Sequence, residues 1–346
     1  MNMSLHQHPH RRFNILTGEW ILVSPHRTKR PWQGKVEKKI DDHRPPHDEN
    51  CYLCPGNKRT SGEVNPNYTS PYSFVNDFSA LLNDTPQQKY DQELLKAKSE
   101  RGICKVICFS PDHSLTLPLM SVEDITAVIK LWQQEYKILG DHVDINHVQI
   151  FENKGQMMGC SNPHPHGQIW AQESVPLEVQ KKTTHFKRHF QESGRNLLED
   201  YLSLELKEDK RVLYADDYMV IIVPYWAVWP FEAMIIPKKR VAHLNEFSTS
   251  QEKSFAKAIK HLTTIYDNLF ETSFPYSAGI HQAPTDGEDH PEWHLHMSFY
   301  PPLLRSAIVK KFMVGYELFA EPQRDITAEQ AANRLKELSN VHYTKR

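Results

Sequence analysis

The stretch CSNPHPHGQIW, residues 160–170, decides the fold, because a related stretch, HLHMSFY, returns at residues 294–300. His164 and His166 of the first stretch are followed by His294 and His296 at the same spacing of 130 residues. Two candidate helix starts, at residues 121 and 249, are separated by a similar 128 residues. A repeat in both a helix and a histidine pair indicates that one supersecondary unit occurs twice.

Three segments carry the start signal of a helix. Each begins with a serine or threonine that is followed three residues later by an acidic or amide side chain, which is a capping box. The pairs are Ser121 with Asp124, Thr249 with Glu252, and Thr327 with Gln330. The first two continue with apolar residues at helical spacing, and we expect the third helix to end near Leu338.

Short β-branched or aromatic runs bounded by Pro, Gly or Asn predict strands. These runs cover residues 20–24, 104–109, 148–153, 168–172, 219–223, 232–236 and 293–300. Residues 37–50 and 84–101 are polar, and we expect a loop in the first and a loop or exposed excursion in the second. Together with the repeat, the pattern predicts an α+β fold in which two copies of one unit share a common sheet.

Composition excludes several classes of protein. The chain has 346 residues, a formal net charge of −2 and 24% charged residues, and it has no basic stripe with interleaved aromatics, so we expect no nucleic-acid or membrane partner. Residues 218–237 are apolar but contain three prolines and Glu232, which indicates two buried strands rather than a membrane span. Five cysteines make a disulfide framework improbable, and we expect a cytoplasmic protein.

The chemistry of the histidine stretch depends on its prolines. Pro163 and Pro165 fix the backbone and prevent a helix, and alternation along an extended chain lets His164 and His166 address one region. A neutral imidazole is a good nucleophile near pH 7, so this arrangement suits transfer of a phosphoryl or nucleotidyl group. Spacing alone leaves a polar turn or an adventitious metal-binding tract as an equal alternative. Nearby glycines at residues 155, 159 and 167 let the backbone approach a phosphate.

The same stretch resembles the active-site signature of the galactose-1-phosphate uridylyltransferases, a branch of the histidine triad superfamily. The similarity continues through RRFNILTGEWILVSPHRTKRPWQG (11–34), CFSPDHSLTLP (108–118), FENKG (151–155), YDNLF (266–270), FYPPLLRS (299–306) and KFMVGYE (311–317). The resemblance therefore extends over nearly the whole chain. It implies two histidine-triad-like halves, residues 1–175 and 176–346, with a mainly antiparallel sheet flanked by helices.

This resemblance implies a ping-pong reaction in galactose metabolism. His166 would take the uridylyl group from UDP-glucose as a covalent adduct, and galactose 1-phosphate would then accept it. Gln168 would hydrogen-bond the phosphoryl oxygens as a neutral donor. The matching substrate-binding positions are Arg27, Arg30, Asn76, Asp77, Asn153, Gly159, Cys160, Ser161, Gln168, Lys311, Phe312, Tyr316, Glu317 and Gln323. Arg27 and Arg30 would reach the site from a neighbouring subunit, so a homodimer is expected.

Cys51 and Cys54 have the two-residue spacing with which two thiolates bind one zinc ion, although a reduced structural pair has the same spacing. By resemblance, His113 and His164 complete a Cys₂His₂ zinc site. Four protein ligands leave no open position, so the role of this zinc would be structural.

A second metal, iron or zinc, is bound by members of the family through one glutamate and three histidines. His281 and His296 match two of these positions, but Lys182 replaces the glutamate and Ser298 replaces the third histidine. Because an ammonium group repels a divalent cation, we expect this second site to be empty of metal. His294 and, more distantly, Glu178 are the nearest substitutes.

Two other functions fit parts of the sequence. A related histidine triad transferase or phosphorylase would use the same nucleophile on adenine nucleotides. A zinc-stabilised nucleotide-binding protein would bind the ligand without turnover. The segment around KFMVGYE favours hexose 1-phosphate and uridine over the first, and the intact pair of His166 and Gln168 disfavours the second.

Overall fold

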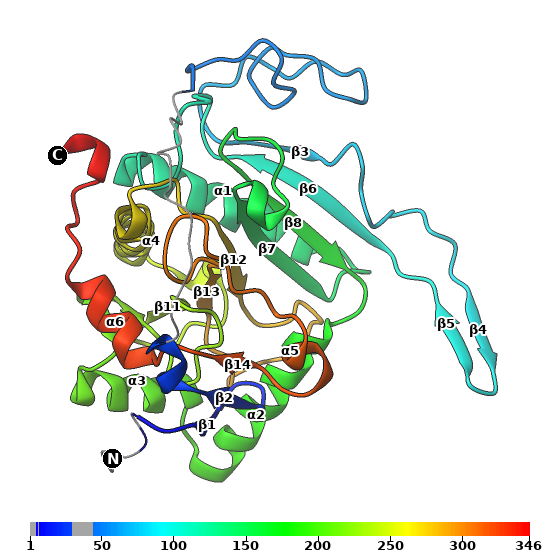
Figure 1. Cartoon of the computed structure of the whole chain (residues 1–346). Coiled ribbons are helices and arrows are strands. Elements are labelled where there is room, and N and C mark those ends of the chain that lie inside the picture. Colours follow the sequence, from blue (N-terminus) through cyan, green and yellow to red (C-terminus); the bar gives the residue numbers. More distant parts are fainter. Residues whose placement is uncertain (1–4, 6, 30–43) are drawn as a thin grey trace.

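The central sheet explains the repeat in the sequence. In the computed structural model, which describes residues 5, 7–29 and 44–346, nine strands pair antiparallel in the order β3-β6-β8-β7-β12-β13-β11-β10-β9 (Figure 1). Their bounds are β3 Tyr72–Val75, β6 Gly102–Cys108, β7 His147–Lys154, β8 His166–Gln172, β9 Val212–Ala215, β10 Met219–Ile222, β11 Ala233–Pro237, β12 Tyr276–His281 and β13 His296–Tyr300.

Two copies of one unit meet at the pair formed by β7 and β12. Outward from this pair, the sheet continues with β8, β6 and β3 on one side and with β13, β11 and β10 on the other. Along the chain each half is a hairpin, a helix and a second hairpin, and the helices are α1 (Val122–Gly140) and α4 (Thr249–Phe270). The prediction of a duplicated α+β unit with a common sheet is confirmed.

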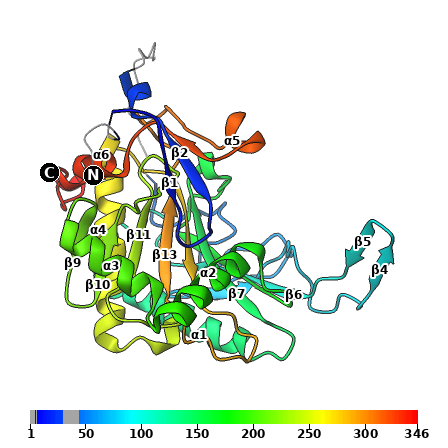
Figure 2. The same ribbon diagram turned by 90° about the horizontal axis from the view of Figure 1, so that it is seen from below.

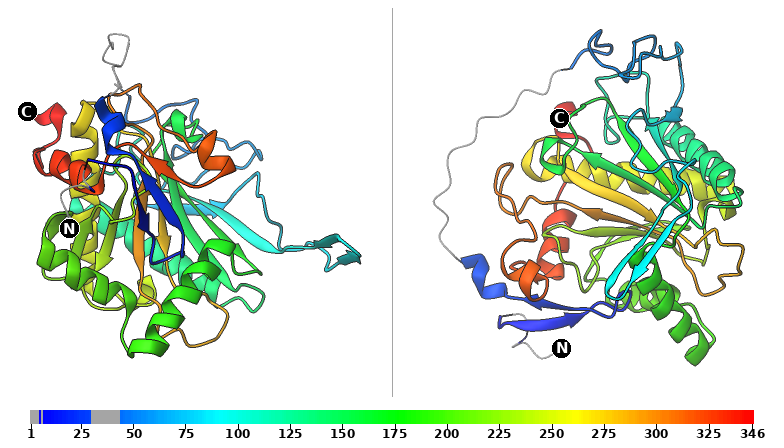
Figure 3. Two further views of the ribbon diagram at one scale, coloured as in Figure 1. Left: turned by 60° about the horizontal axis from the view of Figure 1, so that its bottom comes forward. Right: turned by 90° about the vertical axis from the view of Figure 1, so that its right-hand side faces the viewer.

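Alternation along the strands builds a separate core on each face of the sheet. Along β10, Met219 and Ile221 pack with residues of α1 and α4, whereas Val220 and Ile222 pack with residues of α2 and α3. The bounds of these two helices are α2 Leu177–Ser193 and α3 Leu197–Glu208. The right-hand view of Figure 3 shows α1 and α4 on one side of the strands and α2 on the other.

The helix starts agree with the capping prediction, with one correction. Ser121 caps α1 and Thr327 caps α6 (Ala328–Lys336), each through a complete capping box. In α4 the cap is Ser248 with Gln251, and not Thr249 with Glu252, because the Ser248 side chain accepts from the Gln251 main-chain N–H. Thr249 is already inside the helix. Helix α6 ends two residues before Leu338.

Helices α2 and α3 were not predicted, because their sequences are mostly polar. The buried residues of α2 are Val179, Lys182 and Phe186, so a lysine interrupts its narrow buried stripe. The ends of the predicted strand runs lie within two residues of the strands, except that β13 begins at His296, three residues after the predicted start. Residues 218–237 contain β10 and β11, paired as a hairpin. No helix of the described residues is long and apolar enough to cross a membrane.

The polar segment 84–101 is exposed, as predicted, but it is not a simple loop. It forms a hairpin of β4 (Lys89–Gln92) and β5 (Leu95–Lys98) that projects far from the body (Figure 1). Leu94, at the tip of this hairpin, is 94% exposed. In the predicted loop 37–50, residues 44–50 contain no helix or strand, and residues 37–43 lie outside the described residues.

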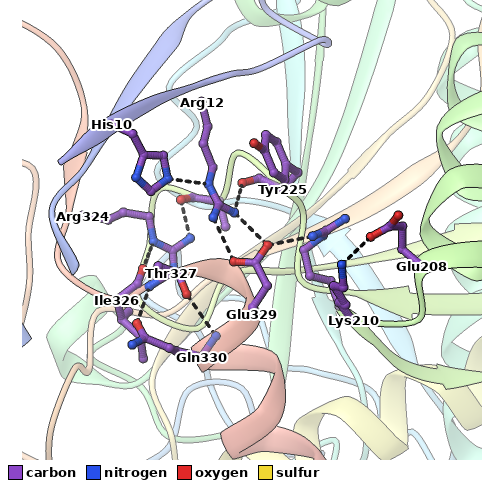
Figure 4. A network of polar contacts seen from close by, with 12 residues as sticks. His10, Arg12, Glu208, Lys210, Tyr225, Arg324, Ile326, Thr327, Glu329 and Gln330 are labelled. Carbon is purple, nitrogen blue, oxygen red and sulfur yellow. Dashed lines mark hydrogen bonds and ion pairs between the residues drawn. The ribbon is translucent and has the colours of Figure 1, made fainter. Parts of the chain in front are cut away.

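A small second sheet lies on the α2 side of the molecule. It consists of β1 (His10–Phe13), β2 (Trp20–Val23) and β14 (Gln323–Arg324), and Figure 2 shows the short helix α5 (Tyr316–Phe319) on the same side. The buried side chain of Arg12 in β1 donates two hydrogen bonds to Glu329 in α6, at 3.0 and 2.9 Å. Figure 4 shows how this ion pair ties β1 to α6. The remaining short helices are η2 Pro25–Lys29, η3 Gln156–Met158, η4 Leu244–Glu246 and η5 Tyr343–Lys345.

Candidate active site and metal cluster

His166 is the first residue of β8, and its ring is held by the main chain. Nδ1 lies 2.7 Å from the carbonyl oxygen of His164, and since a carbonyl only accepts, Nδ1 carries the proton. Burial lowers the pKa of His166, so the imidazole is neutral near pH 7. Among the described residues Nε2 has no hydrogen-bond partner. The ring therefore presents the lone pair of Nε2 to its surroundings, which is what a nucleophilic imidazole requires.

His164 and His166 both line the first cavity described below, but their ring nitrogens have different partners. Residues 161–165 are not part of a strand, so the alternation of an extended chain does not apply there. His164 is buried and faces Cys54 and His113, with Nδ1 3.6 Å from the Cys54 sulfur. His166 faces the cavities described next. The carbonyl of His164 nevertheless links the two sites, because it fixes the ring of His166.

Three adjoining cavities share His166 as a lining residue. The first, of about 380 Å³, lies beside the loop that follows β7 and the segment 160–165. The second, of about 210 Å³, lies beside β3 and the segment 52–60. The third, of about 160 Å³, lies above residues 159–162. A ligand that extends from one of these cavities into another would therefore have its central part next to His166.

The first and third cavities contain Cys160 and Ser161, which were expected on the phosphate side, and also Asn153, which was expected beside the nucleotide. Asn153, Cys160 and Ser161 line both, and Gly159 lines the third, where its φ of +79° is one that glycine favours. At Gly167 a side chain would come within 2.9 Å of the Phe151 carbonyl oxygen, so only glycine fits there.

A buried charge network behind the first cavity was missed from the sequence. Glu152 and Lys154 line this cavity and lie on either side of Asn153 in β7. Alternation along the strand places their two side chains on the same face, and this was the signal available in the sequence. The ammonium of Lys154 lies 2.8 Å from Asp267, at the end of α4. Burial raises the pKa of Glu152 to about 7, and the Tyr276 hydroxyl donates to this carboxyl at 3.0 Å.

The second cavity brings together Asn76 and Asp77, which were expected beside the nucleotide, with Gln168. Asn153, expected in the same group, does not line it. Asp77 accepts hydrogen bonds from the Thr60 hydroxyl at 3.0 Å and from the main-chain N–H of Ser61 at 3.2 Å, so it fixes the loop that closes the cavity. The aromatic rings of this cavity were missed from the sequence, and they are Tyr52, Phe74 and Phe78. Flat apolar walls with a few polar groups are typical of a site for a planar ring.

Gln168 has a defined amide orientation. The indole N–H of Trp170 donates to its Oε1 at 3.1 Å, so the amide NH₂ is the group left to donate into the site. Gln168 shares a face of the sheet with His166, two residues before it, and lines two of the three cavities. A neutral donor beside Nε2 suits a phosphoryl oxygen that gains negative charge.

Four of the remaining predicted residues gather in a second cluster with Asp325, which was not predicted. We call it the β14 cluster and define it as Arg27, Lys311, Glu317, Gln323 and Asp325. Arg27 pairs with Asp325 at 3.0 Å, Gln323 donates to Asp325 at 2.9 Å, and Lys311 contacts both Gln323, at 3.1 Å, and Glu317. No member lines any of the three cavities around His166.

Two further predicted residues, Phe312 and Tyr316, belong to the same region. Phe312 is half-buried next to Lys311, and Tyr316 in α5 is exposed. Arg30 lies outside the described residues. Within one described chain, the predicted substrate residues therefore form two separate groups.

Cys51, Cys54, His113 and His164 converge on one point. Their ligand atoms all lie within 4.8 Å of one another, and all four residues are buried. The Cys54 sulfur is 3.5 Å from Nδ1 of His113 and 3.6 Å from Nδ1 of His164. Tetrahedral zinc with Zn–S of about 2.3 Å and Zn–N of about 2.0 Å requires roughly 3.5 Å between such atoms. The cluster is able to hold a metal ion.

The protonation of the four side chains is also suited to binding a cation. Burial raises the pKa of Cys54 to about 11, so a thiolate at this position needs a positive charge beside it. Nε2 of His164 lies 2.9 Å from the Ser110 carbonyl, which places the proton there and directs the lone pair of Nδ1 at the cluster. Cys104 and Cys108 are buried core residues, as predicted, and neither belongs to this group.

The second set of metal ligands does not converge. His281 and His296 lie side by side with ring centroids 4.8 Å apart, but Ser298 and Lys182 stand at the other two positions. Among the described residues, the only set of three or more histidine, cysteine or acidic side chains in metal-binding geometry is the one around Cys54. The substitutes fail as well, because both ring nitrogens of His294 lie near oxygen partners and Glu178 pairs with Lys181.

Comparison with known proteins shows similarity to one family over nearly the full length of the chain. Residues 1–176 match the model of the galactose-1-phosphate uridyl transferase N-terminal domain, and residues 181–346 match that of the C-terminal domain. The chain is 54% identical to galactose-1-phosphate uridylyltransferase of Haemophilus influenzae, over 98% of this chain and 97% of the relative. It is 48% identical to the enzyme of the same name from Saccharomyces cerevisiae, over 98% and 97%.

Solved structures with the same fold include a uridylyltransferase, with a TM-score of 0.74 and 25% identity over 94% of this chain and 97% of that one. An ADP-glucose phosphorylase from Arabidopsis thaliana with bound ADP-glucose has a TM-score of 0.75 over 96% and 99%, but at 23% identity it shows the fold alone. With both halves matched and relatives about half identical from end to end, the chain belongs to the galactose-1-phosphate uridylyltransferase family.

Proposed function

We propose that this protein is a UDP-glucose:hexose-1-phosphate uridylyltransferase of galactose metabolism, and that it works through a covalent uridylyl-His166 intermediate. The observation that carries the proposal is the ring of His166, which is fixed through Nδ1 and lines all three cavities. The family to which the chain belongs supports uridine and hexose 1-phosphate over the adenine-nucleotide alternative.

The first half-reaction forms one bond and breaks one. The Nε2 lone pair attacks the α-phosphorus of UDP-glucose, and the bridging oxygen leaves with its electron pair as part of glucose 1-phosphate. The imidazole becomes positively charged in the adduct, and the hydrogen bond from Nδ1 to the His164 carbonyl stabilises that charge. In the second half-reaction a phosphate oxygen of galactose 1-phosphate attacks the same phosphorus, the N–P bond breaks, and UDP-galactose leaves.

The groups around His166 divide between the phosphates and the nucleoside. Gln168 donates its amide N–H to the phosphoryl oxygens, where negative charge increases during transfer. Gly159, Cys160, Ser161 and Asn153 contact the phosphate side of the first and third cavities. Asn76 and Asp77 bind the nucleoside in the second cavity, and its aromatic walls favour the flat uracil ring.

Zinc is the metal that we assign to Cys51, Cys54, His113 and His164. Two thiolates and two imidazoles in tetrahedral geometry are a preferred zinc set, and they leave no open position for substrate. When bound, the ion supplies a rigid crosslink and no chemistry of its own. His164 belongs to this cluster and its carbonyl fixes His166, so the metal site positions the nucleophile.

We further propose a homodimer in which the β14 cluster of one subunit completes the His166 site of the other. Arg27, Arg30, Lys311, Phe312, Tyr316, Glu317 and Gln323 would then bind the hexose and phosphate groups. The described members of this set do not line the three cavities of their own chain, which supports this arrangement. The projecting hairpin of β4 and β5 also supports it, since its exposed Leu94, Leu95 and Tyr90 need a covering partner.

Two further proposals concern organisation and location. We divide the chain into histidine-triad-like halves at residues 1–175 and 176–346, which the arrangement of the strands about β7 and β12 supports. We place the protein in the cytoplasm, in agreement with five cysteines that form no disulfide.

A donor-exchange assay tests the function. Purified protein is incubated with galactose 1-phosphate and either UDP-glucose or ADP-glucose, and products are separated by chromatography. We expect UDP-galactose and glucose 1-phosphate from the first donor and a rate at least about 100-fold lower from the second, because the second cavity selects the base. Equal use of ADP-glucose, or its phosphorolysis in the presence of inorganic phosphate, would instead identify the adenine-nucleotide phosphorylase.

A further inference from the structure

A lysine occupies the centre of the second histidine pair. Lys182 of α2 is buried, with 4% of its side chain exposed, and its Nζ lies 2.8 Å from Nε2 of His296. Nδ1 of His296 lies 3.0 Å from the carbonyl oxygen of His294, so Nδ1 carries the proton and Nε2 accepts from the lysine. The lysine thus donates to the nitrogen whose lone pair a metal ion would take.

The neighbouring imidazole is neutral as well. His281 stacks on His296 with ring centroids 4.8 Å apart and an angle of 20° between the planes. Burial, followed by the proximity of Lys182, lowers the pKa of both histidines well below the ordinary value. Two parallel neutral rings avoid the repulsion that two imidazolium ions would suffer at this separation.

The polar groups around Lys182 cannot complete the coordination sphere of a metal ion. Glu232, a buried acidic residue just before β11, accepts from the main-chain N–H groups of Val228 and Trp229. Ser298 supplies no imidazole, and Glu178 is held by Lys181. Two imidazoles alone cannot fill the four or more positions of zinc or iron.

We propose that the amino group of Lys182 takes the place of a second metal ion and joins α2 to β13 through His296. The second half of the chain then needs no metal, and the protein holds one metal ion per chain, in the Cys₂His₂ cluster. Burial lowers the pKa of Lys182 to about 7, and both its protonated and its neutral form can donate to Nε2. The crosslink therefore does not depend on the charge of the lysine.

The proposal explains an asymmetry between the halves of the duplicated fold. His166 and His296 occupy corresponding positions, at the starts of β8 and β13, and both rings are fixed by the carbonyl two residues earlier. Nε2 of His166 faces cavities, whereas Nε2 of His296 is covered by Lys182. In the first half the Nε2 lone pair of His166 is open to the cavities and available for chemistry. In the second half the corresponding lone pair of His296 accepts a hydrogen bond that holds α2 against β13.

Metal analysis of three purified full-length proteins tests the proposal. Wild type, Lys182→Met and the double variant Lys182→Glu with Ser298→His are loaded with Zn²⁺ or Fe²⁺, desalted and measured by inductively coupled plasma mass spectrometry. We expect one equivalent per chain in wild type and in Lys182→Met, because removing the amine adds no ligand. The double variant restores a carboxylate and a third imidazole, and we expect two equivalents.

A cobalt titration of the wild-type protein tests the proposal even if the double variant does not fold. Wild-type protein titrated with Co²⁺ should saturate at one equivalent, with the thiolate charge-transfer bands of the Cys₂His₂ cluster. A second wild-type equivalent without thiolate bands, lost in His296→Asn, would overturn the proposal. A folded double variant that stays at one equivalent would overturn it as well, since the lysine would then not occupy a metal position.

Discussion

The rings of His166 and His296, which lie 130 residues apart in the chain, are held in the same way. Each Nδ1 donates to the main-chain carbonyl two residues earlier, at 2.7 Å for His166 and 3.0 Å for His296. The difference lies at Nε2, which is without a described partner in the first ring and is bound by Lys182 in the second. Under the proposed mechanism, the environment of this one nitrogen decides which half of the protein can form a covalent adduct.

Gly167 should not tolerate a side chain. Its Cβ would lie 2.9 Å from the Phe151 carbonyl oxygen and 2.9 Å from the Phe109 ring, so Gly167→Ala must move β8 and with it His166. We expect a loss of roughly 1–3 kcal/mol in the free energy of unfolding and a fall in kcat of about 100-fold. Urea unfolding and steady-state kinetics measure the two effects.

Gly279→Ala is the matched control, since Gly279 also lies in a central strand but its Cβ would meet nothing closer than 3.4 Å. Equal losses in the two variants would show that the close contact at Gly167 does not position His166.

Removal of one thiol should empty the metal cluster. Cys54→Ser replaces a thiolate by a poor zinc ligand, and we expect less than about one tenth of the wild-type zinc content. We also expect a fall in Tm and in activity, because His164 loses its fixed position and its carbonyl supports His166. Cys104→Ser, a buried cysteine outside the cluster, should retain its zinc. A full zinc content in Cys54→Ser would contradict the assignment.

The sequence predicts those parts of the structure that depend on local signals. Capping boxes at Ser121 and Thr327 place two helices, and the recurrence of the His-x-His pair reveals the duplication. Helix α2 escapes prediction because Lys182 lies in its buried stripe, where its only hydrogen-bond partner in the described chain is a histidine 114 residues away. A local sequence pattern cannot predict a contact between residues so far apart in the chain.

The sequence also predicts only part of the site. The paired spacing of Cys51 and Cys54 indicates a metal, but His113 and His164 follow only from resemblance, since folding alone brings them together. The strand expected at residues 168–172 is part of β8, in which His166 and Gln168 lie on one face, whereas His164 lies before the strand begins. The separation of the β14 cluster from the His166 cavities is a long-range property and has no signature in sequence.

Glu329 should contribute stability that is lost in acid. Burial by itself raises the pKa of this carboxyl, but hydrogen bonds from Arg12 and then Arg211 outweigh it and hold the pKa at about 2, against an ordinary 4.5. The stabilisation is therefore complete above pH 4.5 and is lost as pH falls toward 2. We expect Glu329→Gln to lower the free energy of unfolding by about 3 kcal/mol at pH 7, since buried Arg12 loses its counterion.

Urea unfolding from pH 7 to pH 2 checks this expectation. The difference between wild type and Glu329→Gln should stay constant down to about pH 4.5 and disappear near pH 2. Glu208→Gln, which breaks only the exposed pair with Lys210 drawn in Figure 4, should leave the unfolding curve unchanged. A difference that does not narrow in acid would show that the ion pair is not its source.

Two inactive variants should complement each other if subunits share the site. His166→Gly and Lys311→Ala each disable every site in their own homodimers. After mixing, unfolding and refolding, heterodimers contain one site with both intact residues, so random pairing of two chains restores about a quarter of wild-type activity. Activity that remains absent, in a mixture shown to contain heterodimers by mass spectrometry, would place both residues in the same subunit's site.

Intact-protein mass spectrometry after mixing with UDP-glucose tests the central claim most directly. Wild type should gain the mass of one uridylyl group, and addition of galactose 1-phosphate should remove it as UDP-galactose appears. A folded, metal-loaded His166→Gly variant should gain nothing. No adduct on folded, metal-loaded wild type, or an adduct of equal yield on His166→Gly, would contradict covalent transfer through His166.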